Sequence, residues 1–233
     1  MPTILITGAN RGLGLEFARQ YAADGWRVLA ACREPKSATA LAALPGAIDI
    51  FALEVTDFSS IESLAAELKG TPIDVLLNNA GQFGPRLLKS GERGQAFGHI
   101  DYDEWMRILR VNTFAPVKMA EAFIAHVVAS GQKKIVAITS TMGSIASTEG
   151  GYYIYRTSKA ALNMAMASLA KDVAARGVAV AVYCPGWVKT DMGGSMADIE
   201  PEVSIAGLRG RIGELSLAAS GIFRRYDGDA IPW

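Results

Sequence analysis

Short apolar runs that alternate with helix-like stretches constrain the fold of this chain more than any other feature. Six such runs occupy residues 3–7, 26–31, 47–55, 72–81, 133–140 and 177–186. Strands that are apolar throughout are buried on both faces, which is typical of parallel sheets with helices on each side. The alternation therefore predicts an α/β fold with a doubly wound, mostly parallel sheet. A short run at residues 222–225 supplies a seventh strand.

Composition limits the number of domains and the classes of partner. The chain has 233 residues, 50% of them hydrophobic, and its 23 basic residues balance 23 acidic ones. This length suits one well-buried core, and the alternation continues without a linker, so we expect a single domain over residues 1–233. Zero net charge without a basic stripe argues against a nucleic-acid partner.

The cysteines, the histidines and the first residues argue against a disulfide-bonded, metal-binding, secreted or membrane protein. Cys32 and Cys184 form neither a ligand cluster nor a disulfide framework, which suits a reducing cytosol. His99 and His126 belong to no metal-ligand pattern, so we expect no metal. The apolar opening passes at once into glycine-rich sequence and is neither a signal peptide nor a membrane span. We therefore expect a cytoplasmic protein without a membrane partner.

A glycine-rich turn follows the first apolar run. Residues 7–14 read TGANRGLG and lead into a helix-like stretch that ends near Gly25. Glycines let the backbone approach a pyrophosphate, whose charge is favoured at a helix N-terminus. The spacing G-x-x-x-G-x-G differs from the commoner dinucleotide fingerprint, and a plain structural turn is the alternative. Its position between a buried strand and a helix favours cofactor binding.

Tyr155 and Lys159 are the candidate acid/base pair. Residues four apart on a helix lie on one face, and a lysine ammonium beside a phenol lowers the phenol pKa. Such a Y-x-x-x-K pair also arises by chance on exposed helices. Tyr152 would pair only with Arg156, which cannot take the same role.

Two irregular segments, residues 82–102 and 186–202, follow strands of the predicted sheet. Ligands of doubly wound sheets bind beyond the carboxyl ends of the strands, so we expect these segments to form pocket walls or lids.

Taken together, these motifs resemble the short-chain dehydrogenase/reductase family. The glycine turn, Asn78-Asn79-Ala80-Gly81, the Tyr155–Lys159 pair and Pro185-Gly186 occur in the family's order along the whole chain. Within the family, the chain most resembles the branch of C-factor and sniffer-type carbonyl reductases. This resemblance rests on the segments GGYYIYRTSKAALN, CPGWVKTDMGG and YDGDAIPW. The resemblance implies a Rossmann fold and NADPH-dependent reduction of a ketone, aldehyde or quinone.

The resemblance assigns four catalytic residues. Tyr155 would be the general acid, Lys159 would bind the nicotinamide ribose and tune the tyrosine, and Ser140 would hold the carbonyl oxygen. Asn112 would anchor a water that links Lys159 to solvent. Thr139, Thr141 and Ser144 are alternatives to Ser140, which we prefer because it ends an apolar strand.

The resemblance also outlines the cofactor site. Arg11 and Arg33 would hold the 2′-phosphate of NADP(H), although Glu34 could instead bind the ribose of NAD(H). Glu54 replaces the family's aspartate at the adenine. The full set of expected cofactor-binding residues is Gly8, Asn10, Arg11, Gly12, Leu13, Gly14, Arg33, Glu54, Val55, Asn79, Ala80, Gly81, Tyr155, Lys159, Pro185, Gly186, Val188 and Thr190.

Apolar and adaptable side chains near these motifs predict the substrate pocket. They are Gln82, Phe83, Met142, Tyr152, Trp187, Met192 and Met196, each of which could equally belong to the core. The sequence places no arginine obviously against a substrate carboxylate. Relatives often dimerise through the helices that carry Asn112 and Tyr155, so we expect a homodimer. The alternative function is an NAD(P)H-binding sensor or signalling protein of the C-factor type with little turnover.

Overall fold

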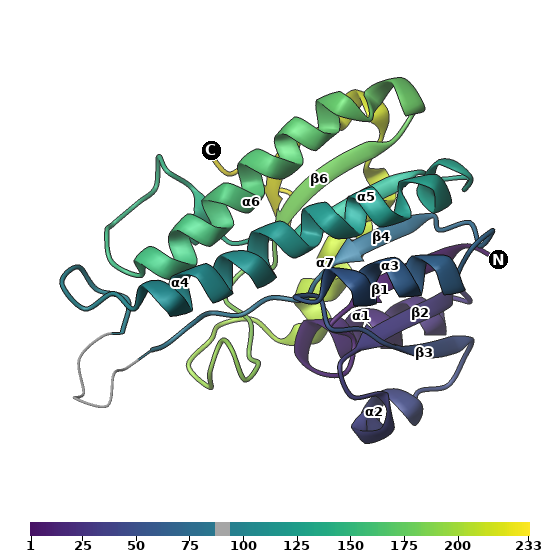
Figure 1. The fold of residues 1–233 in the computed structure, drawn as a ribbon, viewed down its shortest axis with the longest axis horizontal. Helices are drawn as coiled ribbons and strands as arrows, with labels where there is room; N and C mark the ends of the chain where they lie inside the picture. Colours follow the sequence, from purple (N-terminus) through teal and green to yellow (C-terminus); the bar gives the residue numbers. More distant parts are fainter. Residues whose placement is uncertain (87–93) are drawn as a thin grey trace.

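A seven-stranded sheet forms the centre of the molecule (Figure 1). The structure is a computed structural model and describes residues 1–86 and 94–233. The strand order is β3-β2-β1-β4-β5-β6-β7, and every neighbouring pair is parallel. The strands are β1 Thr3–Thr7, β2 Arg27–Cys32, β3 Ile48–Ala52, β4 Val75–Asn78, β5 Lys134–Ile138, β6 Ala179–Cys184 and β7 Ile222–Arg225. The predicted doubly wound fold is confirmed.

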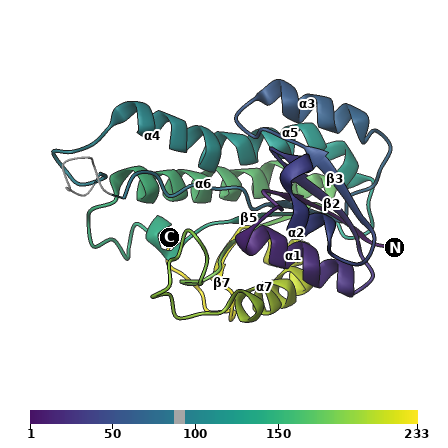
Figure 2. The ribbon, with the colours of Figure 1, turned by 90° about the horizontal axis from the view of Figure 1, so that it is seen from below.

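Helices cover both faces of this sheet (Figure 2). One face carries α3 (Phe58–Glu67), α5 (Ala115–Val128) and α6 (Tyr153–Asp172). The other carries α1 (Gly12–Ala23), the short α2 (Thr39–Ala42) and α7 (Pro201–Glu214).

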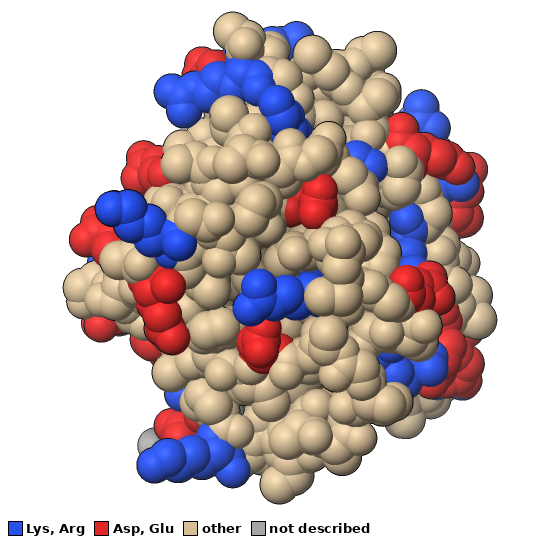
Figure 3. All heavy atoms as spheres, turned by 90° about the vertical axis from the view of Figure 1, so that its right-hand side faces the viewer, with Lys and Arg blue, Asp and Glu red and all other residues tan. Residues whose placement is uncertain are grey.

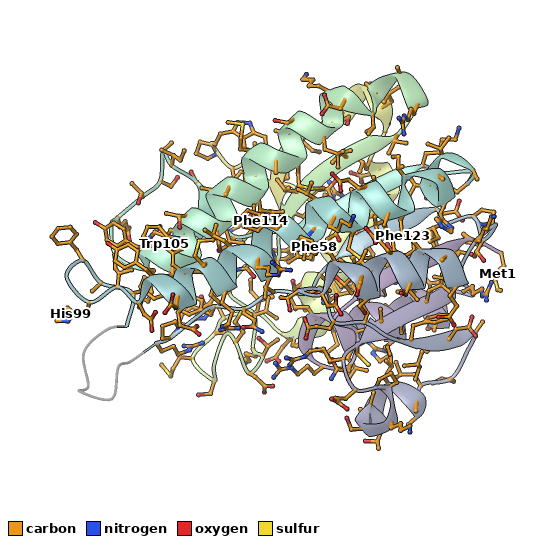
Figure 4. All side chains as sticks on the ribbon, viewed as in Figure 1. Met1, Phe58, His99, Trp105, Phe114 and Phe123 are labelled. Carbon is orange, nitrogen blue, oxygen red and sulfur yellow. The ribbon has the colours of Figure 1, made fainter. Side chains whose placement is uncertain are left out.

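Strand β1 shows why both faces must be covered. Leu5 packs into the core beneath α3, α5 and α6, whereas Ile4 and Ile6 pack against α1 and α7. All three are fully buried, because successive side chains of a strand point to opposite faces. Phe123 of α5, labelled in Figure 4, is fully buried in the first of these cores.

The strand order reverses between β1 and β4. Chain segments that leave these two strands turn to opposite faces of the sheet and leave a crevice at their carboxyl ends. The glycine turn after β1 and the segment after β4 both begin there. The topology therefore places the predicted site at one edge of the sheet.

Two helical features differ from the sequence prediction. The sequence of residues 103 to about 130 reads as a single helix, but α4 (Tyr102–Leu109) and α5 are joined by a π-helical turn at Arg110–Phe114. Helix α7 was not predicted, although Pro201 at its first position and buried Ile205 and Leu208 are helix signals. Part of the irregular segment at 82–102, residues 87–93, lies outside the described residues.

Acidic and basic side chains are interspersed on the face shown in Figure 3. No helix within residues 1–86 and 94–233 is both long and apolar enough to cross a membrane.

Candidate active site

The glycine turn brings α1 close to β1. Gly8 and Gly12 have φ values of +66° and +53°, a region that glycine adopts without strain. A Cβ on Gly14 would lie 2.1 Å from the Gly8 carbonyl oxygen and 2.6 Å from Asn79 Nδ2. Any side chain at position 14 would therefore push α1 away from the turn.

The segment after β4 is tied to the glycine turn. Asn79 Nδ2 donates to the carbonyl oxygens of Thr7 (2.9 Å) and Gly8 (3.2 Å). The backbone N–H groups of Asn79 and Ala80 both donate to Thr7 Oγ1, at 3.1 and 3.0 Å. These bonds join the two sides of the crevice at its floor.

A cleft of about 710 Å³ opens over this floor. Its lining includes most of the expected cofactor-binding residues: Gly8, Asn10, Arg11, Gly12, Leu13, Gly14, Arg33, Glu54, Val55, Asn79, Ala80, Gly81, Tyr155, Lys159, Pro185 and Thr190. Gly186 and Val188 belong to the same segment as Pro185 but are not part of this lining.

The residues present fit a dinucleotide. The first turn of α1 lines the cleft, and Arg11 at its N-cap gives it no side-chain hydrogen bond. Backbone N–H groups at such an end bind a pyrophosphate. Glycine at position 14 keeps the turn clear of a Cβ that the backbone could not accommodate.

The charged residues that are expected near the adenosine have different surroundings. Arg33 lines the cleft, whereas Glu34 is exposed and lies outside the lining. Arg11 Nη1 lies 3.1 Å from Asp191 Oδ2, so it joins the glycine turn to the segment after β6. Glu54 accepts hydrogen bonds from the N–H (2.9 Å) and hydroxyl (2.8 Å) of Thr56.

Tyr155 and Lys159 line the cleft from the helix after β5, whereas Arg33 follows β2 on the other side of the β1–β4 switch point. Both are buried in the first turns of α6, with exposed fractions of 7% and 4%. Lys159 Nζ lies 5.8 Å from the centre of the Tyr155 ring and donates to the Ile138 carbonyl oxygen at 2.8 Å. The end of β5 therefore fixes the lysine beside the tyrosine.

Among the hydroxyls after β5, Ser140 is the one that interacts with the Tyr155 side chain and lowers its pKa. Its Oγ also accepts from the Met142 N–H at 3.1 Å. The alternative Thr139 lines the cleft but donates to Asn163 Oδ1 at 2.7 Å, and Ser144 donates to the carbonyl oxygen of Trp233 at 3.3 Å.

The pKa of Tyr155 differs in direction from the sequence expectation. Burial raises the pKa of this phenol well above its ordinary value, and the interaction with Ser140 offsets only part of the rise. Burial also lowers the pKa of Lys159 to about 8. The net shift of the tyrosine pKa is therefore opposite to the expected one, because desolvation of the buried phenol is its largest cause.

Asn112 lies in the π-helical turn and is fully buried. Its Oδ1 accepts from the Gln82 N–H and its Nδ2 donates to the Gln82 carbonyl oxygen, both at 2.8 Å. Nδ2 also donates to Ser158 Oγ at 2.9 Å. Asn112 thereby fixes the segment after β4 against α6.

Only some of the expected pocket residues come together. Gln82, Phe83 and Met192 line the cleft, but Met142, Tyr152, Trp187 and Met196 are not part of its lining. A role of these four residues in substrate binding stays a prediction. Trp187 Nε1 instead donates to the Gly193 carbonyl oxygen at 2.9 Å, and Met196 is 79% exposed. Tyr152 packs edge-on against Phe83, with ring centres 5.5 Å apart.

Sequence reasoning missed four charged residues of the cleft, Arg86, Glu104, Arg107 and Asp191. The Arg86 guanidinium lies 5.1 Å from the Phe83 ring centre and contacts the Met192 carbonyl oxygen. Arg107 is paired with Glu104 and with Gln82. Arg86, Glu104 and Arg107 follow no motif, and only the fold brings them to the cleft.

A doubly wound sheet, a glycine turn at its switch point and a buried tyrosine–lysine pair in the same cleft define a dinucleotide-dependent oxidoreductase. Residues 2–200 match the short chain dehydrogenase family, and the chain belongs to that family.

Known relatives support the same placement. The chain is 37% identical over 163 residues to C-signal of Myxococcus xanthus. The matched region covers 70% of this chain and 93% of C-signal. The carbonyl reductase Sniffer of D. melanogaster has a TM-score of 0.88 and 31% identity, with both chains fully covered. NADPH-bound carbonyl reductase from chicken fatty liver has a TM-score of 0.87 and 32% identity over 100% of this chain and 99% of that one.

Proposed function

We propose that this protein reduces a ketone, aldehyde or quinone to an alcohol with NADPH. The observation that carries the proposal is the cluster of Tyr155, Ser140 and Lys159 at one end of a dinucleotide-sized cleft. The similarity to two carbonyl reductases, one of them NADPH-bound, supports it.

Each residue of the cluster has a role in this reaction. Bound NADPH supplies the hydride. Tyr155 donates a proton to the carbonyl oxygen, and its raised pKa keeps the phenol protonated at neutral pH. Ser140 holds the same oxygen by a hydrogen bond. Lys159 stabilises charge on Tyr155 as the proton leaves.

The basic residues at the other end of the cleft support NADP(H) over NAD(H). Arg33 lines the cleft and Glu34 does not, so a 2′-phosphate would meet the arginine. Arg11 would add a second positive charge if it exchanged Asp191 for the phosphate.

The substrate end of the cleft favours a carbonyl compound with an apolar body. The Phe83 ring packs on Tyr155, with ring centres 4.5 Å apart, and forms an aromatic wall beside the phenol. Met192 adds an adaptable apolar contact on the segment after β6.

A turnover assay with a catalytic control tests the proposal. Purified protein is given NADPH and a panel of ketones, aldehydes and quinones, and NADPH oxidation is followed by absorbance. We expect turnover with at least one carbonyl class, and Tyr155→Phe should bind NADPH normally yet lose roughly 100-fold or more in kcat. Tight NADPH binding without oxidation by any carbonyl would contradict the proposal.

The similarity to C-signal supports a second candidate, an NAD(P)H-binding signalling protein with little turnover. In that case Tyr155→Phe would leave signalling intact. The presence of Asn112, Ser140, Tyr155 and Lys159 around one cleft favours catalysis.

We also propose a homodimer through α5 and α6. Exposed apolar side chains next to α5 and on α6, Phe114 at 43% and Met164 at 69%, favour a covered surface there.

A further inference from the structure

Helix α6, which carries Tyr155, begins without a local cap. Tyr152 occupies the N-cap position with φ +48°, in the left-handed region, and gives no side-chain hydrogen bond. The first N–H groups of any helix lack intrahelical partners and must be satisfied from elsewhere when buried. Tyr155 lies within this first turn and is buried.

Gln95, almost 60 residues earlier in the chain, satisfies two of these groups. Its backbone oxygen accepts from the Tyr153 N–H at 3.1 Å, and its side-chain Oε1 accepts from the Tyr155 N–H at 2.8 Å. Gln95 is only 1% exposed, so water cannot take over these contacts. It provides the cap that the residues before α6 do not.

The same side chain holds the wall of the substrate end. Gln95 Nε2 donates to the carbonyl oxygens of Phe83 (2.8 Å) and Pro85 (3.1 Å). Both amide N–H groups and the amide oxygen of Gln95 are therefore bonded. Because the Phe83 ring packs on Tyr155, one amide fixes the backbone of Tyr155 and the chain segment that covers its ring.

We propose that Gln95 is a positioning residue for Tyr155, an inference that rests on the proposed carbonyl reduction. The amide ties the tyrosine backbone to the segment after β4 by three hydrogen bonds that exclude water. Loss of these bonds lets the first turn of α6 fray and the phenol move from the reacting oxygen. Displacements of about 1 Å in an active site can lower a rate by roughly 100-fold.

Two substitutions separate the contacts of the amide. Gln95→Met has a similar shape and removes all three side-chain hydrogen bonds. Gln95→Glu keeps an oxygen for the Tyr155 N–H but loses the donors to Phe83 and Pro85.

Trp105→Phe is the matched control. Trp105 Nε1 donates to Thr157 Oγ1 at 2.8 Å and ties α4 to α6 two residues beyond Tyr155 (Figure 4). This variant also removes a tertiary hydrogen bond from the start of α6, but it leaves the Tyr155 N–H and Phe83 in place.

The variants are compared in full-length protein at a temperature at which all are folded. For Gln95→Met we expect kcat to fall about 10- to 100-fold while the NADPH dissociation constant changes less than about twofold. Gln95→Glu should also lower kcat at least about 10-fold, because its buried carboxylate repels the carbonyl oxygens of Phe83 and Pro85. The kcat of Trp105→Phe should stay within about threefold of that of the wild-type protein. A Gln95→Met protein with unchanged kcat, or with a loss matched by Trp105→Phe, would overturn the inference.

Amide hydrogen exchange gives a readout that needs no turnover. We expect the Tyr155 N–H to exchange faster in Gln95→Met and to keep its protection in Trp105→Phe. Unchanged protection in Gln95→Met would refute the positioning role even if no carbonyl substrate is found. Absence of turnover in the unchanged protein, with exchange as expected, would instead count against the proposed function alone.

Discussion

Lys159 is a buried ammonium in the candidate site. It is 4% exposed, and its Nζ donates to one carbonyl oxygen, that of Ile138. Burial lowers its pKa to about 8, from an ordinary value of 10.5. A charge held in such a place destabilises the folded state, and the destabilisation disappears when the proton leaves.

The direction in which folding stability changes with pH follows from the pKa values of Lys159 in the folded and unfolded chains. Below about pH 8 the folded and unfolded chains both hold the proton. Above that pH the folded chain releases it while the unfolded chain keeps it up to 10.5, so the folded state gains stability as pH rises. Tyr155, whose pKa is raised, acts in the opposite direction only above its ordinary value of 10.

We predict that stability measured by urea unfolding rises between pH 7 and 9.5 because of Lys159. The contribution is on the order of 1–2 kcal/mol, and Lys159→Met should lack it. Other titrating groups are common to both proteins, so the difference between the two curves isolates the lysine. Parallel curves over this range would show that Lys159 is not buried as a charge.

Site residues were predictable where the sequence itself brings them together. Tyr155 and Lys159 share a helix face by their spacing, and Ser140 follows from its place at the end of a strand. Gln95 was not predictable, because its contacts to Tyr155 and Phe83 join segments that only the tertiary fold brings together. The tyrosine pKa was misjudged because burial cannot be read from helix spacing.

At the scale of elements, two glycines of α7 have opposite surroundings: one is closely packed and the other is open. A Cβ on Gly207 would lie 2.6 Å from the carbonyl oxygen of Tyr226, so the helix packs directly on the backbone after β7. A Cβ on Gly210 would meet no atom within 4 Å. Close approach therefore explains glycine at the first position but not at the second.

We predict that alanine at these two positions changes stability with opposite sign. Gly207→Ala should destabilise the protein by about 1–3 kcal/mol through overpacking. Gly210→Ala should stabilise it by up to about 1 kcal/mol, because alanine is the better helix former. Chemical denaturation of both variants provides the measurement, and equal changes would contradict the packing of α7 on Tyr226.

Elements were predictable from the sequence when their pattern was continuous. All seven strands lie within the predicted runs to within a residue or so, because buried parallel strands are apolar throughout. Helix α7 was missed because glycines at 207, 210 and 213 interrupt its apolar spacing. The π-helical turn was missed for another reason: Arg110–Phe114 reads as ordinary helix, and the extra residue shows only in the backbone.

At the scale of the whole molecule, the cofactor cleft joins both halves of the sheet. Its lining comes from the segments after β1, β2 and β3 on one side and after β4, β5 and β6 on the other. A ligand that spans this cleft therefore stabilises the chain as one unit. Strands β1, β2, β4, β5 and β6 each contribute buried side chains to both hydrophobic cores, one on each face of the sheet.

We predict that the chain unfolds in a single thermal transition that NADPH shifts as a whole. At a free NADPH concentration of 100 times its dissociation constant, binding adds about 2.7 kcal/mol, equivalent to a rise in Tm of roughly 5–10 °C for a chain of this size. NADH at the same concentration should raise Tm less, because Arg33 has no 2′-phosphate to bind.

Arg33→Ala supplies the control for this experiment. It should remove most of the difference between NADPH and NADH while leaving the shift with NADH unchanged, since the rest of the cleft is intact. Two transitions, one shifted by NADPH and one not, would contradict a single domain over residues 1–233. Equal shifts with both cofactors in the unchanged protein would instead contradict the proposed preference, because the ribose phosphate is where the two ligands differ.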